Sequence, residues 1–78
     1  MAQPRGKYVV QVASYQSKAE AEAVKGRLMD AGLPAYIVES VLKDKGTMYR
    51  VRVGKHLEPA AAAELAAKAG KNAIVVME

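Results

Sequence analysis

Apolar and polar residues alternate along the chain in a way that is typical of β-strands. The clearest stretch begins at Tyr8 and reads Tyr-Val-Val-Gln-Val-Ala-Ser-Tyr, rich in the β-branched and aromatic residues that fit a pleated, half-buried surface. Stretches of similar character predict three further strands, at residues 35–41, 48–53 and 73–77. The residues from Lys43 to Gly46 are typical of a turn, so the second and third strands are expected to form a hairpin that ends at Gly54.

Two other segments have helical spacing. Ser17 and Glu20 form a capping box, in which reciprocal hydrogen bonds to free backbone N–H groups begin a helix, and Gly32 ends it. A second, alanine-rich helix is predicted after Pro59, which suits a first helical position because its missing N–H has no partner there, with Gly70 as its cap. The predicted buried stripes are Ala21, Val24, Leu28 and Ala31, followed by Ala62, Leu65, Ala66 and Ala69.

The resulting order is β-α-β-β-α-β, and it repeats internally. Residues 8–12 match residues 49–53, and residues 31–38 match residues 69–76. Two interleaved β-α-β halves predict an α+β, ferredoxin-like or RNP-like fold: a four-stranded antiparallel sheet, order 4-1-3-2, with both helices on one face. We expect residues 1–6 to be a linker or a start added for expression, and residues 7–78 to be the domain.

The arginines decide which face of the sheet lies open. Side chains alternate between the faces of a strand, so Arg50 and Arg52 share one face with Met48. Two unpaired arginines would be costly to bury, and their face is therefore expected to meet solvent. Tyr49, Val51 and Val53 then point toward the helices.

The internal repeat extends this assignment to the other strands. It places Val9, Gln11 and Ala13 on the open face and Tyr8, Val10 and Val12 under the helices. Tyr36 and Ile74 are assigned to the open face as well, although the alternative parity would bury Tyr36 and expose Ile37. The result is a shallow amphipathic surface, whose simplest interpretation is a solvated sheet face.

The composition of the chain limits which classes of function are possible. A chain of 78 residues forms one small domain with little room for an enclosed active site, and it has no cysteine for disulfides, thiolate chemistry or metal binding. A formal charge of +4 favours an anionic or polar partner without specifying one. Residues 1–7 lack the apolar core of a signal peptide, so an export signal for a domain that works outside the cytoplasm would lie upstream.

The strand motifs resemble a known family. Gln-Val-Ala-Ser-Tyr at 11–15, the helix ending in Ala31-Gly32, and Tyr-Arg-Val-Arg-Val-Gly at 49–54 are similar to the SPOR domain, the sporulation-related repeat of bacterial cell-wall and division proteins. The resemblance covers residues 8–77, nearly the whole chain. It implies a peptidoglycan-binding domain that favours glycan strands stripped of their stem peptides, uses the open sheet face, and brings its parent protein to the division septum.

The resemblance also implies site residues. The motif glutamine falls on Gln11, its serine on Ser14 and the third-strand arginine on Arg50, with Met48 and Ile74 at apolar contact positions. The expected glycan-binding set is completed by Arg52 and Tyr36. Ala13 replaces a common glycine, and Lys55 and His56 replace a common proline and aromatic residue after Gly54.

Some of these residues have structural alternatives. Ser14 could stabilise the turn that follows its strand, and Arg52 could form an exposed ion pair with Glu39 across the hairpin. Gly54 is interpreted as a backbone requirement, and Tyr8 and Tyr49 as core residues. His56 has no second ligand at metal spacing and is interpreted as an incidental loop residue.

We therefore expect a non-catalytic domain without cofactor or metal, located in the cell envelope on the periplasmic side of the inner membrane at the division site. The parent protein would be membrane-anchored or a cell-wall enzyme. One rival is an RRM-like module for single-stranded RNA, which shares the fold but needs aromatic residues on its first and third strands to stack bases. Those strands carry Val9, Gln11, Met48, Arg50 and Arg52 on the open face, so nucleic acid is not the expected partner. Another rival is a protein–protein interaction module.

Overall fold

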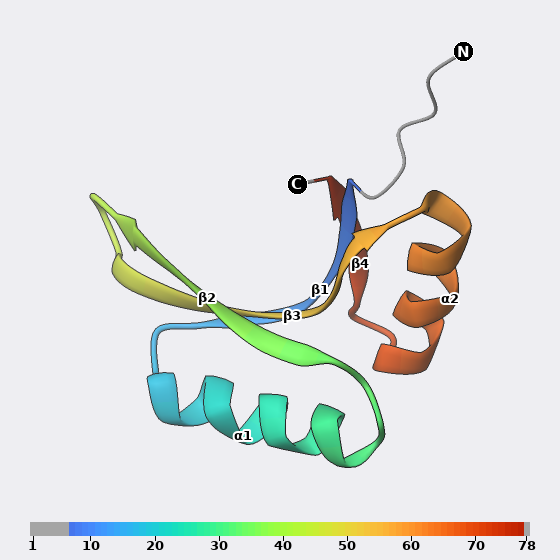
Figure 1. The fold of residues 1–78 in the computed structure, drawn as a ribbon. Coiled ribbons are helices and arrows are strands. Elements are labelled where there is room, and N and C mark those ends of the chain that lie inside the picture. Colours follow the sequence, from blue (N-terminus) through green and yellow to red (C-terminus); the bar gives the residue numbers. More distant parts are fainter. Residues whose placement is uncertain (1–6, 78) are drawn as a thin grey trace.

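The computed structural model describes residues 7–77, which form two helices and four strands (Figure 1). In chain order these are β1 (Tyr8–Tyr15), α1 (Lys18–Asp30), β2 (Ala35–Leu42), β3 (Gly46–Leu57), α2 (Pro59–Ala69) and β4 (Ile74–Met77). The strands form one antiparallel sheet in the order β2-β3-β1-β4, which is the predicted order read from the other edge. The predicted fold class is confirmed. The linker expected over residues 1–6 lies outside the described residues, as does Glu78.

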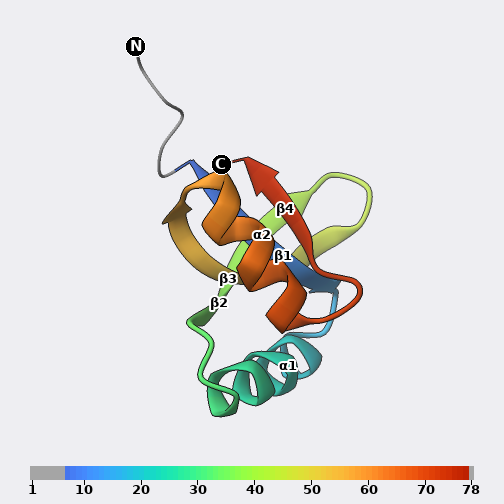
Figure 2. The same cartoon turned by 90° about the vertical axis from the view of Figure 1, so that its right-hand side faces the viewer.

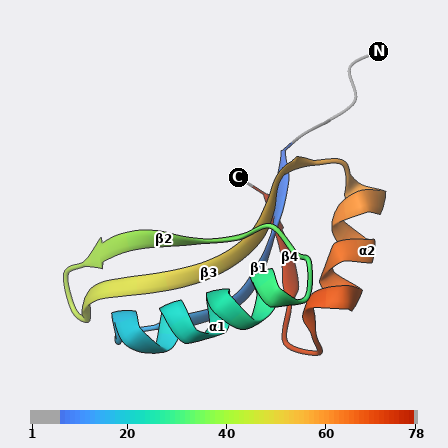
Figure 3. The same ribbon diagram turned by 60° about the horizontal axis from the view of Figure 1, so that its bottom comes forward.

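The sheet is bent, and the helices lie on the outer side of the bend. Figure 1 shows α1 beneath the half that contains the hairpin of β2 and β3, and α2 beside the half that contains β4. Figures 2 and 3 show the same division from two other directions, with no helix over the inner side in the described part of the chain. The helix-free face is therefore the inner face of the bend.

The core lies between the sheet and the two helices. Val10, Val51 and Val53 point into it from the two central strands and have no exposed surface. The helices contribute Ala21, Val24, Leu28 and Ala62, with Leu65, Ala66 and Ala69 partly buried against them. The predicted stripes are thus confirmed with one exception. Ala31 is exposed, because α1 ends one residue earlier and Ala31 forms its C-cap.

The structure contains one of the two hydrogen bonds of the predicted capping box, and Pro59 and Gly32 act as predicted. The Ser17 hydroxyl accepts a hydrogen bond of 3.2 Å from the backbone N–H of Glu20, which satisfies one of the free donors at the start of α1. Pro59 stands in the first turn of α2, where no N–H is needed. Gly32 has a φ of +87°, a left-handed conformation that lets the chain turn from α1 toward β2.

The prediction that the third strand ends at Gly54 is wrong, because β3 continues to Leu57. Val10 pairs with Val53 and Tyr8 pairs with Leu57, so β3 uses two more residues than β1 over this stretch. Both Gly54 and His56 have positive φ angles, +76° and +54°. This stretch of β3 is therefore a β-bulge, an irregularity that bends a strand and increases its twist. This bulge, residues 54–56, lies where the sheet turns in Figure 1.

The predicted exposure of Val9 is wrong. Val9 pairs with Val76 and points to the side opposite Val10, which is the open face, yet none of its surface is exposed. It stands opposite the bulge in β3, on the inner side of the bend. Val9 therefore belongs to the packed interior and is not available to a ligand.

Truncation of Val51 tests the core. We expect Val51→Ala to lower the free energy of unfolding by about 1–3 kcal/mol, because it leaves a cavity at a fully buried position. Val41 is 82% exposed, so Val41→Ala is a matched control that should change stability by less than about 0.5 kcal/mol. Urea denaturation of both variants measures the difference. Equal losses would contradict the burial of Val51 between the sheet and the helices.

Candidate functional site

The open face of the sheet brings together side chains from all four strands. Cross-strand pairing places Tyr36 beside Arg52, Val38 beside Arg50 and Ser40 beside Met48. Gln11 lies between Arg52 and Ile74. The open face comprises Gln11, Ser14, Tyr36, Val38, Ser40, Met48, Arg50, Arg52 and Ile74.

The parity of β2 agrees with the assignment of Tyr36 to the open face. Ile37 pairs with Val51 and packs against the core, whereas Tyr36 pairs with Arg52. Glu39 pairs with Tyr49 and therefore belongs to the helix side. The alternative in which Ile37 is exposed is excluded.

A second irregularity in β1 brings Ser14 to the open face. Gln11 pairs with Arg52, but Ala13 pairs with Val51, so Val12 and Ala13 together oppose one residue of β3. This β-bulge displaces the alternation by one position. The predicted placement of Ala13 on the open face is consequently wrong, and Ser14 stands opposite Arg50 instead. Ser14 therefore lies within β1, opposite Arg50.

Arg52 is held by Gln11. Its Nε–H donates a hydrogen bond of 3.2 Å to the amide oxygen of Gln11, and both groups are partly buried. This bond uses the acceptor of the glutamine and one donor of the guanidinium. The amide NH2 of Gln11 and the terminal N–H groups of Arg52 remain donors for a ligand.

Arg50 is held by Ser40, a residue that the sequence reasoning missed. An Nη1–H of Arg50 donates a hydrogen bond of 2.9 Å to the Ser40 hydroxyl, and this contact too is partly buried. Counting back from the hairpin turn at Gly46 would have placed Ser40 opposite Met48, on the same face as Arg50. The hairpin register was therefore the available signal.

Both arginines are oriented by neutral partners. Within the part of the chain that the structure describes, neither guanidinium forms an ion pair. The alternative pair of Arg52 with Glu39 is excluded, because Glu39 lies on the other side of the sheet. Two cations, two residues apart on a central strand and oriented by neutral partners, form a site suited to an anion with several hydrogen-bond acceptors.

Apolar side chains flank this polar centre. Met48 and Tyr36 are partly exposed, and Ile74 on the edge strand β4 is 54% exposed. Thioether, phenol and branched aliphatic groups around a polar centre can contact a ligand that has both apolar and polar surfaces. The open face therefore has the amphipathic character that the sequence predicts.

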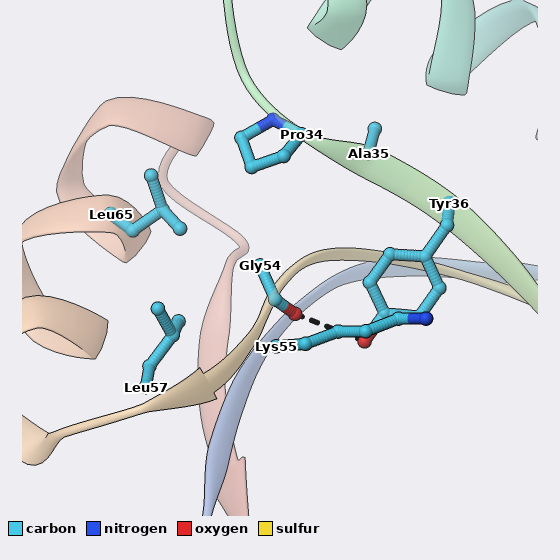
Figure 4. A pocket seen from close by; sticks show the side chains of 7 residues that line it. All are labelled: Pro34, Ala35, Tyr36, Gly54, Lys55, Leu57 and Leu65. Carbon is cyan, nitrogen blue, oxygen red and sulfur yellow. Dashed lines mark hydrogen bonds between the residues drawn. The ribbon is translucent and has the colours of Figure 1, made fainter. Parts of the chain in front are cut away.

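A pocket adjoins the open face at the bulge of β3. Figure 4 shows its lining, which comes from the start of β2, the end of β3 and α2: Pro34, Ala35, Tyr36, Gly54, Lys55, Leu57 and Leu65. Its volume is about 460 Å³. The hydroxyl of Tyr36 donates a hydrogen bond of 3.0 Å to the carbonyl oxygen of Gly54, and the Lys55 ammonium lies 4.8 Å from the centre of the Tyr36 ring. Sequence reasoning identified no pocket here.

Other predicted residues have structural roles. Tyr8 and Tyr49 pack against the core, as expected. His56 lies in the bulge of β3. Among residues 7–77 no group of three or more histidine, cysteine or acidic residues could hold a metal ion, and neither helix is long and apolar enough to cross a membrane.

Comparisons with known proteins agree with this architecture. The family model described as the SPOR domain matches residues 4–76. The chain belongs to the SPOR domain family. A solved structure with the same fold is the solution structure of the peptidoglycan binding domain of the B. subtilis cell wall lytic enzyme CwlC, which is 30% identical to this SPOR domain, with a TM-score of 0.75. The similarity covers 100% of this chain and 96% of that one. Among curated proteins no match was found.

The lack of space for a side chain at Gly54 can be tested separately from the requirement for a positive φ angle there. A Cβ at Gly54 would lie 2.8 Å from side-chain carbons of both Leu57 and Leu65, whereas one at Gly46 would meet nothing within 4 Å. Both glycines have positive φ angles, +76° and +73°. We expect Gly54→Ala to lower the free energy of unfolding by about 1–3 kcal/mol more than Gly46→Ala, because overpacking adds to a similar conformational cost. Denaturant unfolding of both variants measures this, and equal losses would mean that Gly54 serves its φ angle alone.

Proposed function

We propose that this SPOR domain is a non-catalytic module that binds the glycan strands of peptidoglycan on its open face. Three findings support the proposal: membership of the family, similarity over the whole chain to a domain described as peptidoglycan binding, and the arginine pair at the centre of the open face. The arginine pair is the observation that carries it. Two oriented cations without an acidic partner in the described chain provide a binding site for an anionic ligand.

The glycan has the matching charge where its stem peptides are missing. Removal of a stem peptide exposes the lactyl carboxylate of an N-acetylmuramic acid, so a denuded strand is a polyanion with repeated amides and hydroxyls. An arginine can hold such a carboxylate through two parallel hydrogen bonds, each worth about 1.5–3 kcal/mol. Arg50 and Arg52 are the proposed carboxylate contacts, with Ser14 beside Arg50 as a further hydroxyl.

The remaining residues of the open face suit the sugars themselves. The amide NH2 of Gln11 can donate to an N-acetyl carbonyl or a hydroxyl group, since its oxygen already accepts from Arg52. Tyr36, Met48 and Ile74 can pack against the apolar faces of sugar rings. The proposed contact set is therefore Gln11, Ser14, Tyr36, Met48, Arg50, Arg52 and Ile74.

A preference for denuded strands follows from two physical effects. A stem peptide removes the carboxylate charge by forming an amide, and it adds bulk that would collide with the inner face of the sheet. Amidases produce denuded glycan during division, so the domain would bring a larger protein to the septum, on the periplasmic side of the inner membrane. That protein could be a membrane-anchored division factor, an amidase or a lytic transglycosylase.

RNA binding is the rival use of a helix-free sheet face. The central strands present Gln11, Ser14, Met48, Arg50 and Arg52 there, and none of these is an aromatic platform for base stacking. Tyr36 is the aromatic residue of the open face, but it lies on β2 and its hydroxyl bonds to Gly54. The stacking chemistry that RNA requires is therefore poorly supported.

Co-sedimentation with purified sacculi tests the proposal directly. The domain is incubated with sacculi before and after amidase digestion, with single-stranded RNA as a parallel ligand in a gel-shift measurement. We expect binding to sacculi that increases after the stem peptides are removed, and no comparable binding to RNA. Binding to RNA without binding to sacculi would refute the proposal.

Substitution of Arg50 tests the site. Arg50→Ala should weaken binding to amidase-treated sacculi about tenfold or more, and lower the free energy of unfolding by no more than about 1.5 kcal/mol, because a partly exposed side chain loses one hydrogen bond, to Ser40. Arg27 is exposed in the last turn of α1, on the opposite layer, so Arg27→Ala removes the same charge as a matched control. Binding isotherms and thermal unfolding of both variants separate the two roles. A larger loss of stability in Arg50→Ala, or equal weakening by Arg27→Ala, would count against the site.

A further inference from the structure

The pocket at the β3 bulge differs chemically from the arginine centre of the open face. Its walls are formed by Pro34 and Ala35 on one side and by Leu57 and Leu65 on the other, with Gly54 on its floor (Figure 4). These are apolar groups. The basic side chain among the lining residues is Lys55, which is exposed. An apolar pocket with one ammonium group suits a small group that has both a methyl and a negative charge.

Tyr36 connects this pocket with the open face. Its backbone pairs with Arg52, so it is a neighbour of the arginine centre, and its side chain also lines the pocket. The Tyr36 side chain has two contacts here. Its hydroxyl donates a hydrogen bond to the Gly54 carbonyl oxygen, and the Lys55 ammonium lies over the face of its ring. A ligand that lies along the open face can therefore reach the pocket without leaving the protein surface.

The bulge is what brings Lys55 to this place. In a regular strand, residues 52, 54 and 56 would share one face, and Lys55 would point toward the helices. The positive φ angles of Gly54 and His56 break that alternation. Lys55 instead lies against Tyr36, a residue of the open face. Arg50, Arg52 and Lys55 thus form a row of cations along β3.

We propose that this pocket binds the lactyl ether of an N-acetylmuramic acid residue, with its methyl group packed against Leu57 and Leu65 and its carboxylate paired with Lys55. The inference rests on the proposed function, because it assumes that a denuded glycan lies on the open face. Charge complementarity and the continuity through Tyr36 support it: a glycan with one carboxylate per muramic acid can engage the arginine centre and Lys55 with different residues of the same strand. Lys55 is then a specificity-determining residue for strands with more than one free carboxylate.

Two soluble glycan probes test the assignment. One is a denuded glycan oligosaccharide with free lactyl carboxylates, and the other is the same oligosaccharide with those carboxylates converted to primary amides. Lys55→Met keeps an unbranched side chain of nearly the same length and removes its charge. We expect it to weaken binding of the carboxylate probe about three- to fivefold, the range of a partly exposed ion pair, and to leave binding of the amide probe unchanged. Isothermal titration calorimetry measures both.

Lys18→Met is the matched control, because Lys18 is exposed at the start of α1 in the opposite layer. It should bind both probes as the unchanged domain does. A separate measurement locates the methyl group of the lactyl ether. NMR signals of the Leu57 and Leu65 methyl groups should shift when the carboxylate probe is added, while those of Leu28, a buried residue of α1, should not.

The outcomes distinguish this assignment from the proposed function. If the unchanged domain binds neither probe, the proposed function fails and the pocket assignment fails with it. If the domain binds the carboxylate probe and responds to Arg50→Ala, but Lys55→Met binds normally, the pocket assignment alone is overturned. Static Leu57 and Leu65 signals would overturn it as well.

Discussion

The alternation of side chains along β3 is the constraint on which both the fold and the candidate site depend. β3 is paired on both sides, so its register is shared with β1 and with β2. In that register Val51 and Val53 fill the core while Arg50 and Arg52 stand on the open face. A slip by one residue would exchange the two sets and bury both cations without partners. The hydrophobic burial that stabilises the domain therefore also positions its charged centre.

Most of the fold could be predicted because its signals are local. Strand alternation, the Ser17 cap and the repeated β-α-β pattern each depend on residues close together in the sequence, and they agree with one another. The two bulges depend on how β1 and β3 meet across the sheet, which no local pattern records. They account for the misplaced Val9 and Ala13, and for the continuation of β3 beyond Gly54.

For the candidate site, too, some features could be predicted from the sequence and others could not. The positions of Gln11, Arg50 and Arg52 on one face followed from parity and the internal repeat. What holds the arginines did not, since Ser40 reaches Arg50 from another strand and Gln11 reaches Arg52 across the sheet. The pocket beside Tyr36 was out of reach as well, because β2, β3 and α2 each supply part of its lining. Sequence patterns thus indicated which groups are available, and tertiary structure determines how they are oriented.

The neutral partners of the two arginines have a consequence for the thermodynamics of recognition. A long, flexible side chain loses about 1.5–2 kcal/mol of rotamer freedom when it is fixed in one geometry. Ser40 and Gln11 restrict Arg50 and Arg52 in the unliganded domain, so part of that entropy is already lost on folding. A shallow face on so small a domain has few contacts with which to offset ordering of its own side chains. In the proposed function, in which this face binds a flexible glycan, preorganised cations reduce the part of the entropic cost that the domain itself bears on binding.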